Sequence, residues 1–201
     1  MIKAIVYDLD GMVLTAPRYY TEELENKYNI PLRVSLFSGD DSFNQCKKGE
    51  ISFNEFFKPY YEKWIEYPKY NLTYEEAKQD WFKFSKLNKE IYKIAASLGT
   101  KGIKNLILTN NLKARIEYID ELYKLSDIFQ IIGSYDLGLL KPDPKIYDKL
   151  LEKVDIKSSE VLIFDDKLES ISKLKQFGFK AEIYENNTQF IDLLAKYKIS
   201  F

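Results

Sequence analysis

KAIVYDLDGMVL, residues Lys3–Leu14, is the most informative segment of this chain. Its residues Ala4–Tyr7 form an apolar run rich in β-branched and aromatic side chains, which predicts a strand buried on both faces. Asp8 and Asp10 follow at once, and two acids at the end of a buried strand repel each other and lose solvation. A bound cation, or a reaction that uses the acids, would offset both costs. The alternative is an Asp/Gly turn with solvated acids.

The composition is that of an ordinary globular protein. The chain has 201 residues, of which 45% are hydrophobic and 30% charged, and its net charge is -1. This balance favours neither nucleic acid nor an anionic membrane as a partner. Cys46 is the only cysteine, so no intrachain disulfide can form. No apolar stretch reaches the roughly 20 residues of a transmembrane helix, and the N-terminus does not resemble a signal peptide, so we expect a cytoplasmic location.

Histidine is absent from the sequence. Its absence excludes a Ser-His-Asp or Cys-His catalytic site and any zinc site with histidine ligands. Acid–base chemistry near neutral pH must therefore come from carboxylates, lysine, tyrosine or metal-bound water.

The segment after the first strand is predicted to be wholly helical up to about residue 85. Thr15 and Pro17 predict the start of its first helix. Ser52–Glu55 and Thr73–Glu76 both have the sequence of a capping box. Twelve aromatic residues lie between positions 53 and 84, and they predict a small core for this segment. The alternative is an aromatic pocket that faces the acids.

From residue 86 onward, predicted helices and strands alternate. Short buried strands are predicted at Asn105–Leu108, Phe129–Ile132, Val161–Phe164 and Lys180–Tyr184. Helices are predicted at Glu90–Leu98 (ended by Gly99), Ala114–Leu125, from Asp143-Pro144 to Leu151 after a loop, Leu168–Phe177 and Thr188–Tyr197. The alternation predicts a doubly wound, parallel α/β sheet. Residues 1–14 and 86–201 would form this core, and residues 15–85 would be a helical insertion.

Polar side chains follow four of the predicted strands. They are Asp8 and Asp10, then Thr109 with Asn110, then Lys141, and finally Asp165 and Asp166. Because the carboxyl ends of parallel strands meet at one edge of a sheet, we expect these side chains at one site. Several carboxylates suit Mg²⁺, while a lysine and a hydroxyl suit the oxygens of a phosphoryl group. One carboxylate can act as a nucleophile and another as an acid and base.

Each cluster taken alone has a plainer interpretation. Thr109 is a common type of residue in a turn before a helix, and Asp166 is a common helix N-cap. Lys141 could be a solvated loop lysine, although Pro142 favours an extended backbone that projects its side chain. The joint placement of the clusters favours the functional interpretation.

Together the clusters resemble the motifs of the haloacid dehalogenase-like (HAD) superfamily of phosphohydrolases. YDLDG at Tyr7–Gly11 is similar to the first motif, and LTNN at Leu108–Asn111 to the second. GLLKPDPKIY at Gly138–Tyr147 is similar to the third, and FDDKLESI at Phe164–Ile171 to the fourth. The motifs occur in the family's order, and the resemblance spans the whole chain. It implies a Rossmann-like HAD core and an α-helical cap, the latter at residues 15–85.

The resemblance also implies a role for each motif residue. Asp8 would be the nucleophile and a Mg²⁺ ligand, and Asp10 would be the general acid/base, with its backbone carbonyl reaching the metal. Thr109 and Asn110 would bind the phosphoryl oxygens, and Lys141 would hold the nucleophile and the phosphoryl group. Asp165 would bind the metal directly, and Asp166 would support the metal's water shell. The implied activity is Mg²⁺-dependent hydrolysis of a small phosphorylated metabolite through an aspartyl-phosphate.

Other activities within the superfamily remain as alternatives. Phosphomutases of this family usually carry a histidine in the early cap, and dehalogenating members lack the second acid of the first motif, so the absence of histidine and the presence of Asp10 disfavour both. A non-catalytic module that binds a ligand or a partner is the remaining alternative. Ser170 stands where family members often have Asn or Asp. The sequence predicts neither the substrate, nor the oligomeric state, nor the isomer of the Lys141–Pro142 bond.

Overall fold

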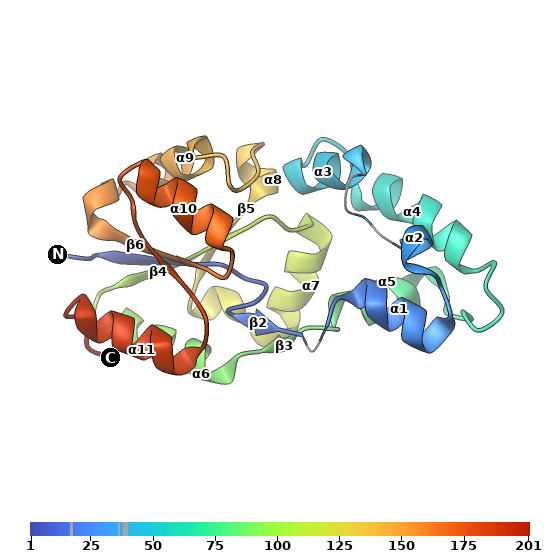
Figure 1. The fold of residues 1–201 in the computed structure, drawn as a ribbon, viewed down its shortest axis with the longest axis horizontal. Helices are drawn as coiled ribbons and strands as arrows, with labels where there is room; N and C mark the ends of the chain where they lie inside the picture. Colours follow the sequence, from blue (N-terminus) through green and yellow to red (C-terminus); the bar gives the residue numbers. More distant parts are fainter. Residues whose placement is uncertain (17, 36, 38–39) are drawn as a thin grey trace.

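A parallel sheet forms the centre of the larger part of the molecule (Figure 1). The structure is a computed structural model that describes residues 1–201 except 17, 36 and 38–39. Its strands are β1 (Ala4–Tyr7), β4 (Lys104–Thr109), β5 (Gln130–Gly133), β6 (Val161–Asp165) and β7 (Lys180–Ile183). They lie in the order β5-β4-β1-β6-β7, and every pairing between them is parallel. The predicted α/β fold with a parallel sheet is therefore confirmed.

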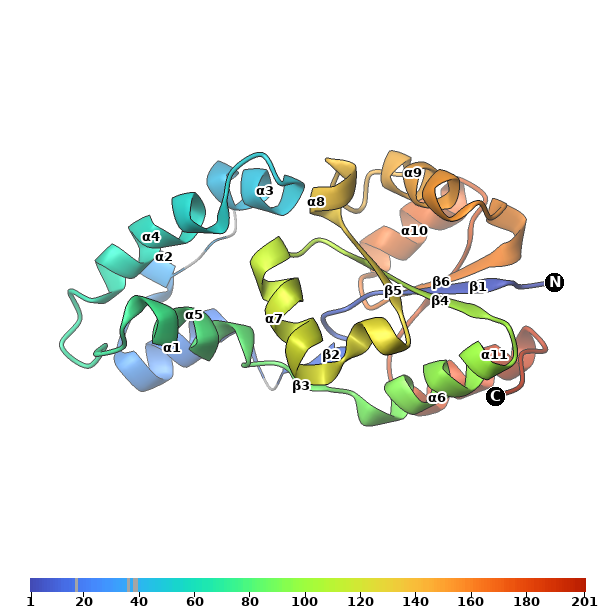
Figure 2. The same cartoon turned by 180° about the vertical axis from the view of Figure 1, so that it is seen from behind.

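Helices cover both faces of this sheet, as Figures 1 and 2 show. On one face lie α6 (Lys89–Thr100), α7 (Lys113–Tyr123) and α11 (Asn187–Lys196), and on the other α9 (Lys145–Val154) and α10 (Leu168–Gln176). Side chains alternate along a strand, so Ile5 and Tyr7 of β1 pack toward the first group, and Ala4 and Val6 toward the second. Buried on both faces, β1 holds the residues that follow it in a fixed place.

Within the described residues, five helices form the other end of the molecule (Figure 2). They are α1 (Tyr20–Tyr28), α2 (Leu32–Ser35), α3 (Asp41–Lys48), α4 (Phe53–Trp64) and α5 (Tyr74–Phe82). The capping boxes predicted at Ser52 and Thr73 are confirmed, at the starts of α4 and α5. Most of the aromatic side chains between residues 53 and 84 pack in an apolar cluster within these helices, around the fully buried Trp64. We call residues 15–85 the cap below.

The chain enters and leaves the cap through two short strands that the sequence analysis missed. β2 (Leu14–Thr15) pairs antiparallel with β3 (Lys86–Leu87). The prediction of a helix start at Thr15 is therefore wrong, and α1 begins only at Tyr20. Pro17, the other residue of that prediction, lies outside the described residues. Two-residue strands have no periodicity to detect, and each of these needs a partner far along the chain to satisfy its backbone groups.

Several other helix boundaries differ from the prediction by one to three residues, and one short helix was not predicted. Gly99 does not end α6, which continues to Thr100, because a glycine weakens a helix by about 1 kcal/mol without breaking it. α9 runs on to Val154. The segment after β5, predicted as a loop, contains the one-turn helix α8 (Ser134–Leu137), and the 3₁₀ turns Leu125–Asp127 and Ser158–Glu160 complete the core. Among the described residues, no helix is both long and apolar enough to cross a membrane.

Candidate active site

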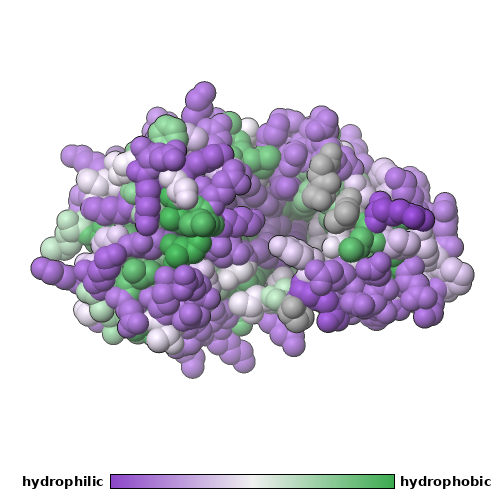
Figure 3. Space-filling model, viewed as in Figure 1, coloured by the Kyte–Doolittle hydropathy of each residue, from purple (hydrophilic) through white to green (hydrophobic). Residues whose placement is uncertain are grey.

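The carboxyl ends of β1, β4 and β6 meet at the edge of the sheet that faces the cap. A cavity of about 110 Å³ lies there, lined by Asp8, Asp10, Thr109, Asn110, Lys141, Pro142, Lys167, Glu169 and Ser170. A water molecule takes about 30 Å³ in the liquid, so this space suits a phosphate group rather than a large ligand. In the space-filling view the surface is hollowed between core and cap, with hydrophilic residues around the hollow (Figure 3). The structure thus brings residues of three of the four sequence clusters to this cavity, and Asp165 of the fourth lies next to it, bonded to Lys141.

Asp8 has one carboxylate oxygen held and the other free. Its Oδ1 accepts hydrogen bonds from the backbone N–H of Leu9 at 2.8 Å and from Lys141 Nζ at 2.6 Å. No described residue donates a hydrogen bond to Oδ2. Burial raises the pKa of Asp8 to about 7; the Lys141 ammonium opposes this rise, and the charges of Asp165 and Asp166 add to it. The free oxygen is therefore the atom available to a ligand.

Lys141 bridges two buried acids. Its Nζ donates to Asp8 Oδ1 and, at 2.8 Å, to Asp165 Oδ2. Burial alone would lower the pKa of this lysine, but the two carboxylates raise it well above its ordinary value, so it stays charged. Asn110 holds the loop in place, because its side-chain amide both donates to and accepts from the backbone of Lys141, each at 2.8 Å. The Lys141–Pro142 peptide bond is cis.

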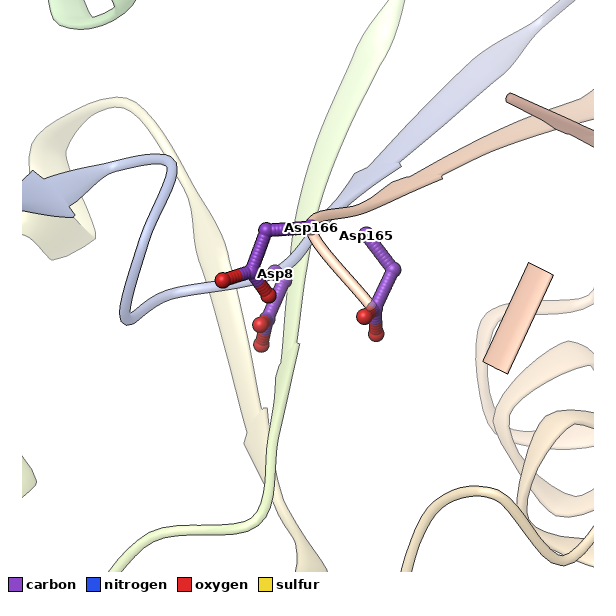
Figure 4. Close-up of side chains that lie close together, drawn as sticks. All are labelled: Asp8, Asp165 and Asp166. Carbon is purple, nitrogen blue, oxygen red and sulfur yellow. The ribbon is translucent and has the colours of Figure 1, made fainter. Parts of the chain in front are cut away.

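Three acids lie close together at the ends of β1 and β6 (Figure 4), and Lys141 bonds to two of them. Asp8, Asp165 and Asp166 each offer a carboxylate oxygen, and these oxygens lie within 4.8 Å of one another. Asp8 and Asp165 are buried, whereas Asp166 is exposed. One lysine charge leaves this group of three carboxylates with an excess of negative charge. Hard oxygen donors with excess negative charge fit a divalent cation such as Mg²⁺.

Gly11 lets the loop after β1 run close to this acid cluster. Its φ of +97° is in the left-handed region that favours glycine. A Cβ on Gly11 would lie 2.2 Å from Asp166 Oδ2, which is far inside van der Waals contact. The glycine of the first motif is therefore required both by the backbone and by the position of Asp166.

Asp10 lies apart from the acid cluster and has its own partners. Arg115 donates from Nη1 to Asp10 Oδ2 and from Nη2 to Oδ1, both at 2.7 Å. Asn111 Nδ2 adds a third bond, to Oδ2, at 2.7 Å. Burial would raise the pKa of Asp10, but the guanidinium and the amide outweigh it and hold the pKa below its ordinary value. The pKa values of the two acids of the first motif are thus shifted in opposite directions.

Sequence reasoning gave no role to Arg115 or Asn111. The signal for Arg115 was present, because it lies at helical spacing within the apolar stripe of Leu112, Ile116 and Ile119. Arg115 is only 6% exposed in the structure, and a buried charge requires a partner. Nothing local says that the partner is Asp10, since the two residues are far apart in the chain.

The cap meets the core beside the cavity through α3 and α8. Ser134 Oγ donates to the backbone carbonyl of Lys47 at 2.6 Å. Burial and the charge of Lys167, a cavity residue, both lower the pKa of Lys47. None of the twelve aromatic residues between 53 and 84 lines the cavity. All but Phe82 belong to the cap's own core, and Phe82 packs on Tyr118 of α7. Ser170 is a buried hydroxyl at the cavity wall.

A second, more open hollow of about 490 Å³ lies at the opposite edge of the sheet, where β1 and β6 begin. Lys3 and Glu160 line it and form an ion pair of 2.7 Å with each other. It contains none of the four clusters, so size alone does not identify the site.

Comparison with known proteins agrees with this geometry. Residues 5–181 match the family described as haloacid dehalogenase-like hydrolase. The chain belongs to this family. Among the relatives of this HAD-like hydrolase, the D-ribitol-5-phosphate phosphatase of Bacteroides thetaiotaomicron is 27% identical over 197 residues, which cover 92% of this chain and 93% of that protein.

Solved structures resemble the HAD-like hydrolase in fold. A HAD family enzyme from Bacteroides thetaiotaomicron, in complex with magnesium and inorganic phosphate, has a TM-score of 0.76 at 18% identity and covers 92% of this chain and 95% of its own. A HAD-like family hydrolase from Porphyromonas gingivalis has a TM-score of 0.78 at 19% identity, over 100% of both chains. At this identity the likeness shows the fold, and both structures share it over almost the whole chain.

Proposed function

We propose that this protein is a Mg²⁺-dependent phosphomonoester hydrolase that acts on a small phosphorylated metabolite through an aspartyl-phosphate at Asp8. The observation that carries the proposal is the free Oδ2 of Asp8 beside a buried lysine and two further acids. A relative named as a phosphatase and a structural neighbour bound to magnesium and phosphate support it.

In the first half of the reaction, Asp8 Oδ2 attacks the phosphorus atom while the bond from phosphorus to the leaving oxygen breaks. Lys141 holds Oδ1 of the nucleophile, so its carboxylate cannot rotate away. Thr109 and Asn110 line the cavity and would donate to the phosphoryl oxygens. Asp10, when protonated, gives its proton to the leaving oxygen, which departs as an alcohol.

In the second half, Asp10 accepts a proton from a water molecule as that water attacks the phosphorus atom. The bond to Asp8 breaks, phosphate leaves, and both aspartates return to their starting states. Mg²⁺ would be held by Asp8, Asp165 and the backbone carbonyl of Asp10, with Asp166 supporting its water shell, and would neutralise charge on the transferring group.

A non-catalytic binding module is the second candidate. Such a module would have no need of a free oxygen on a held Asp8, nor of a second acid fixed by three hydrogen bonds. Dehalogenation is disfavoured because halide needs no protonation, which leaves Asp10 without a task. Phosphomutase activity is disfavoured because the cap contains no histidine.

The decisive experiment is hydrolysis of p-nitrophenyl phosphate with Mg²⁺ or with EDTA. We expect Mg²⁺-dependent turnover that is lost in Asp8→Asn and kept in Asp148→Asn, a change of an exposed acid on α9. Turnover that survives Asp8→Asn would contradict the proposed nucleophile. Absence of turnover on a broad phosphomonoester panel, with Mg²⁺ still binding, would favour the binding module.

The intermediate can be located directly. Borohydride reduces an acyl phosphate to an alcohol but leaves a carboxylate unchanged. Quenching the wild-type enzyme with borohydride during turnover should therefore convert Asp8 to homoserine, as read from the mass of its peptide. The metabolite screen should begin with sugar and polyol phosphates, because the relative named above acts on D-ribitol 5-phosphate.

A further inference from the structure

Arg115 is a buried arginine to which the proposed mechanism gives no part. Its side chain is 8% exposed and its guanidinium forms a bidentate ion pair with Asp10, whose side chain is 48% exposed. The two bonds of 2.7 Å match the fork of a guanidinium to the two oxygens of a carboxylate. Such a pair fixes the plane of the Asp10 carboxylate and not merely its charge.

The bonds to Asp10 leave one place for proton transfer. A carboxylate has roughly four lone-pair sites, two on each oxygen. Oδ2 receives both Arg115 and Asn111, so its sites are filled. Among the residues that the structure describes, Arg115 alone donates to Oδ1, so one of its sites stays open, and Asp10 is half-exposed and lines the cavity. A proton that Asp10 gives or takes therefore passes through Oδ1.

Arg115 also contacts the last residue of the cap, Ser85, where the chain returns to the core through β3; we call residues 85–87 the linker. Its Nη2 donates to Ser85 Oγ at 3.2 Å, and Ser85 directly precedes β3. The backbone carbonyl of Ser85 accepts a bond from Tyr123 at the end of α7, also at 3.2 Å. The same guanidinium thus touches the acid of the first motif and the chain segment through which the cap joins the core.

We infer that Arg115 is a positioning residue, which holds Asp10 with Oδ1 directed at the reacting oxygen and ties this orientation to the linker through Ser85. The inference rests on the proposed phosphatase function. In the first half of that reaction the Oδ1 proton moves to the leaving oxygen as its bond to phosphorus breaks. In the second half Oδ1 takes a proton from the attacking water, so no other reactant is needed.

The test compares two classes of substrate in Arg115→Met and Arg115→Lys. An alkyl phosphate needs its leaving oxygen protonated, whereas p-nitrophenolate leaves without a proton. A positioned acid is worth about 10²- to 10⁴-fold in rate. We therefore expect Arg115→Met to lower kcat/KM for an alkyl phosphate at least about tenfold and kcat/KM for p-nitrophenyl phosphate much less. The comparison uses kcat/KM because this constant covers only the first half of the reaction, whereas kcat also includes the second half, which both substrates share.

Arg115→Lys separates charge from geometry. Lysine keeps the positive charge beside Asp10 but cannot form the bidentate pair of hydrogen bonds. For the alkyl phosphate, kcat/KM of Arg115→Lys should therefore lie between that of Arg115→Met and that of the wild type. Ser85→Ala removes the contact to the linker alone and should give a smaller loss with the same substrate dependence.

Asp10→Asn supplies the matched control. If Arg115 acts through Asp10, adding Arg115→Met to Asp10→Asn should cause no further loss on the alkyl phosphate. Equal losses of kcat/KM on both substrates, or a full additional loss in the double variant, would overturn the inference while leaving the phosphatase proposal intact. A wild-type enzyme that hydrolyses neither substrate with Mg²⁺ would overturn the phosphatase proposal and the inference with it. Thermal unfolding of each variant shows whether the fold is kept, and Arg115→Lys carries the comparison if Arg115→Met does not fold.

Discussion

At the residue scale, the environments of Asp8 and Asp10 separate two chemically identical side chains. Burial raises the pKa of the first, and an arginine and an amide lower that of the second. A cation beside Asp8 would lower the first pKa again and leave that carboxylate ionised, as the proposed nucleophile needs. In a chain without histidine, the proposed mechanism assigns both the nucleophile and the acid–base group to carboxylates.

The raised pKa of Asp8 predicts a pH-dependent stability of the metal-free protein. Between its ordinary value of 3.8 and about 7, the folded protein binds more protons at Asp8 than the unfolded chain does. Stability should therefore fall as pH rises through this window and then level off. The measurement is urea unfolding in EDTA from pH 5 to pH 8. The free energy of unfolding of Asp8→Asn minus that of the wild type should increase as pH rises, because only the wild type loses stability. A constant difference would contradict the raised pKa.

Gly11→Ala should weaken metal binding through Asp166. The new Cβ would displace the Asp166 carboxylate, and disturbing such a group typically costs 10- to 100-fold in metal affinity. Gly102→Ala is the matched control, because Gly102 has a similar φ of +81° but no atom within 4 Å of the added Cβ. Both variants carry backbone strain, so only Gly11→Ala should lower Mg²⁺ affinity in calorimetric titration. An equal loss in both would mean that strain alone is responsible.

Most of the site's residues could be predicted because motifs are local. Asp8, Thr109, Lys141 and Asp165 each follow a recognisable strand, and topology brings them together. The partner of Asp10 could not be predicted in the same way, because a bidentate ion pair between a loop and a distant helix leaves no joint pattern in the sequence.

At the element scale, periodicity identified those helices and strands that are long enough to repeat. The five strands of the sheet and the helices on it have apolar residues at regular spacing. β2, β3 and α8 are too short for a period, and their existence depends on tertiary partners. Helix ends were the other source of error, as at Gly99, because propensity is weak there compared with packing.

The capping box of α4 gives a prediction at this scale. The Ser52 hydroxyl accepts from the backbone N–H of Glu55, and the Glu55 carboxylate accepts in return from the backbone N–H of Ser52. Ser52→Ala should lower the free energy of unfolding by about 1 kcal/mol, whereas Ser52→Thr should keep most of it. Because the box lies in the cap and away from the cavity, kcat at 25 °C should not change. Chemical denaturation and a steady-state assay check both expectations.

At the scale of the whole molecule, the described part of the cap touches the core at the linker strands, between α5 and α7, and where α3 meets α8. The contact of α3 with α8 lies beside the cavity, because the charge of the cavity residue Lys167 acts on Lys47 of α3. The buried Ser134 hydroxyl is its clearest polar bond.

Ser134→Ala should therefore loosen the cap. A hydrogen bond of this kind contributes about 0.5–1.5 kcal/mol, so we expect KM to rise about two- to twelvefold with little change in kcat. Thr100→Ala is the control, since Thr100 makes a comparable bond of 2.7 Å to a backbone carbonyl within α6. Hydrogen exchange should be faster in α3 of Ser134→Ala alone. Unchanged exchange there would mean that the bond does not hold the cap.

The central place of β1 in the sheet has a consequence for folding during synthesis on the ribosome. Ala4 pairs with Lys104 on one side and with Val161 on the other, so β1, which is made before both partner strands, is enclosed only after β6 has been made. The cap, by contrast, is synthesised whole before either partner strand emerges. A nascent chain that stalls before β6 must therefore carry an exposed strand edge next to Asp8, and it also lacks Asp165 and Asp166 of the acid cluster.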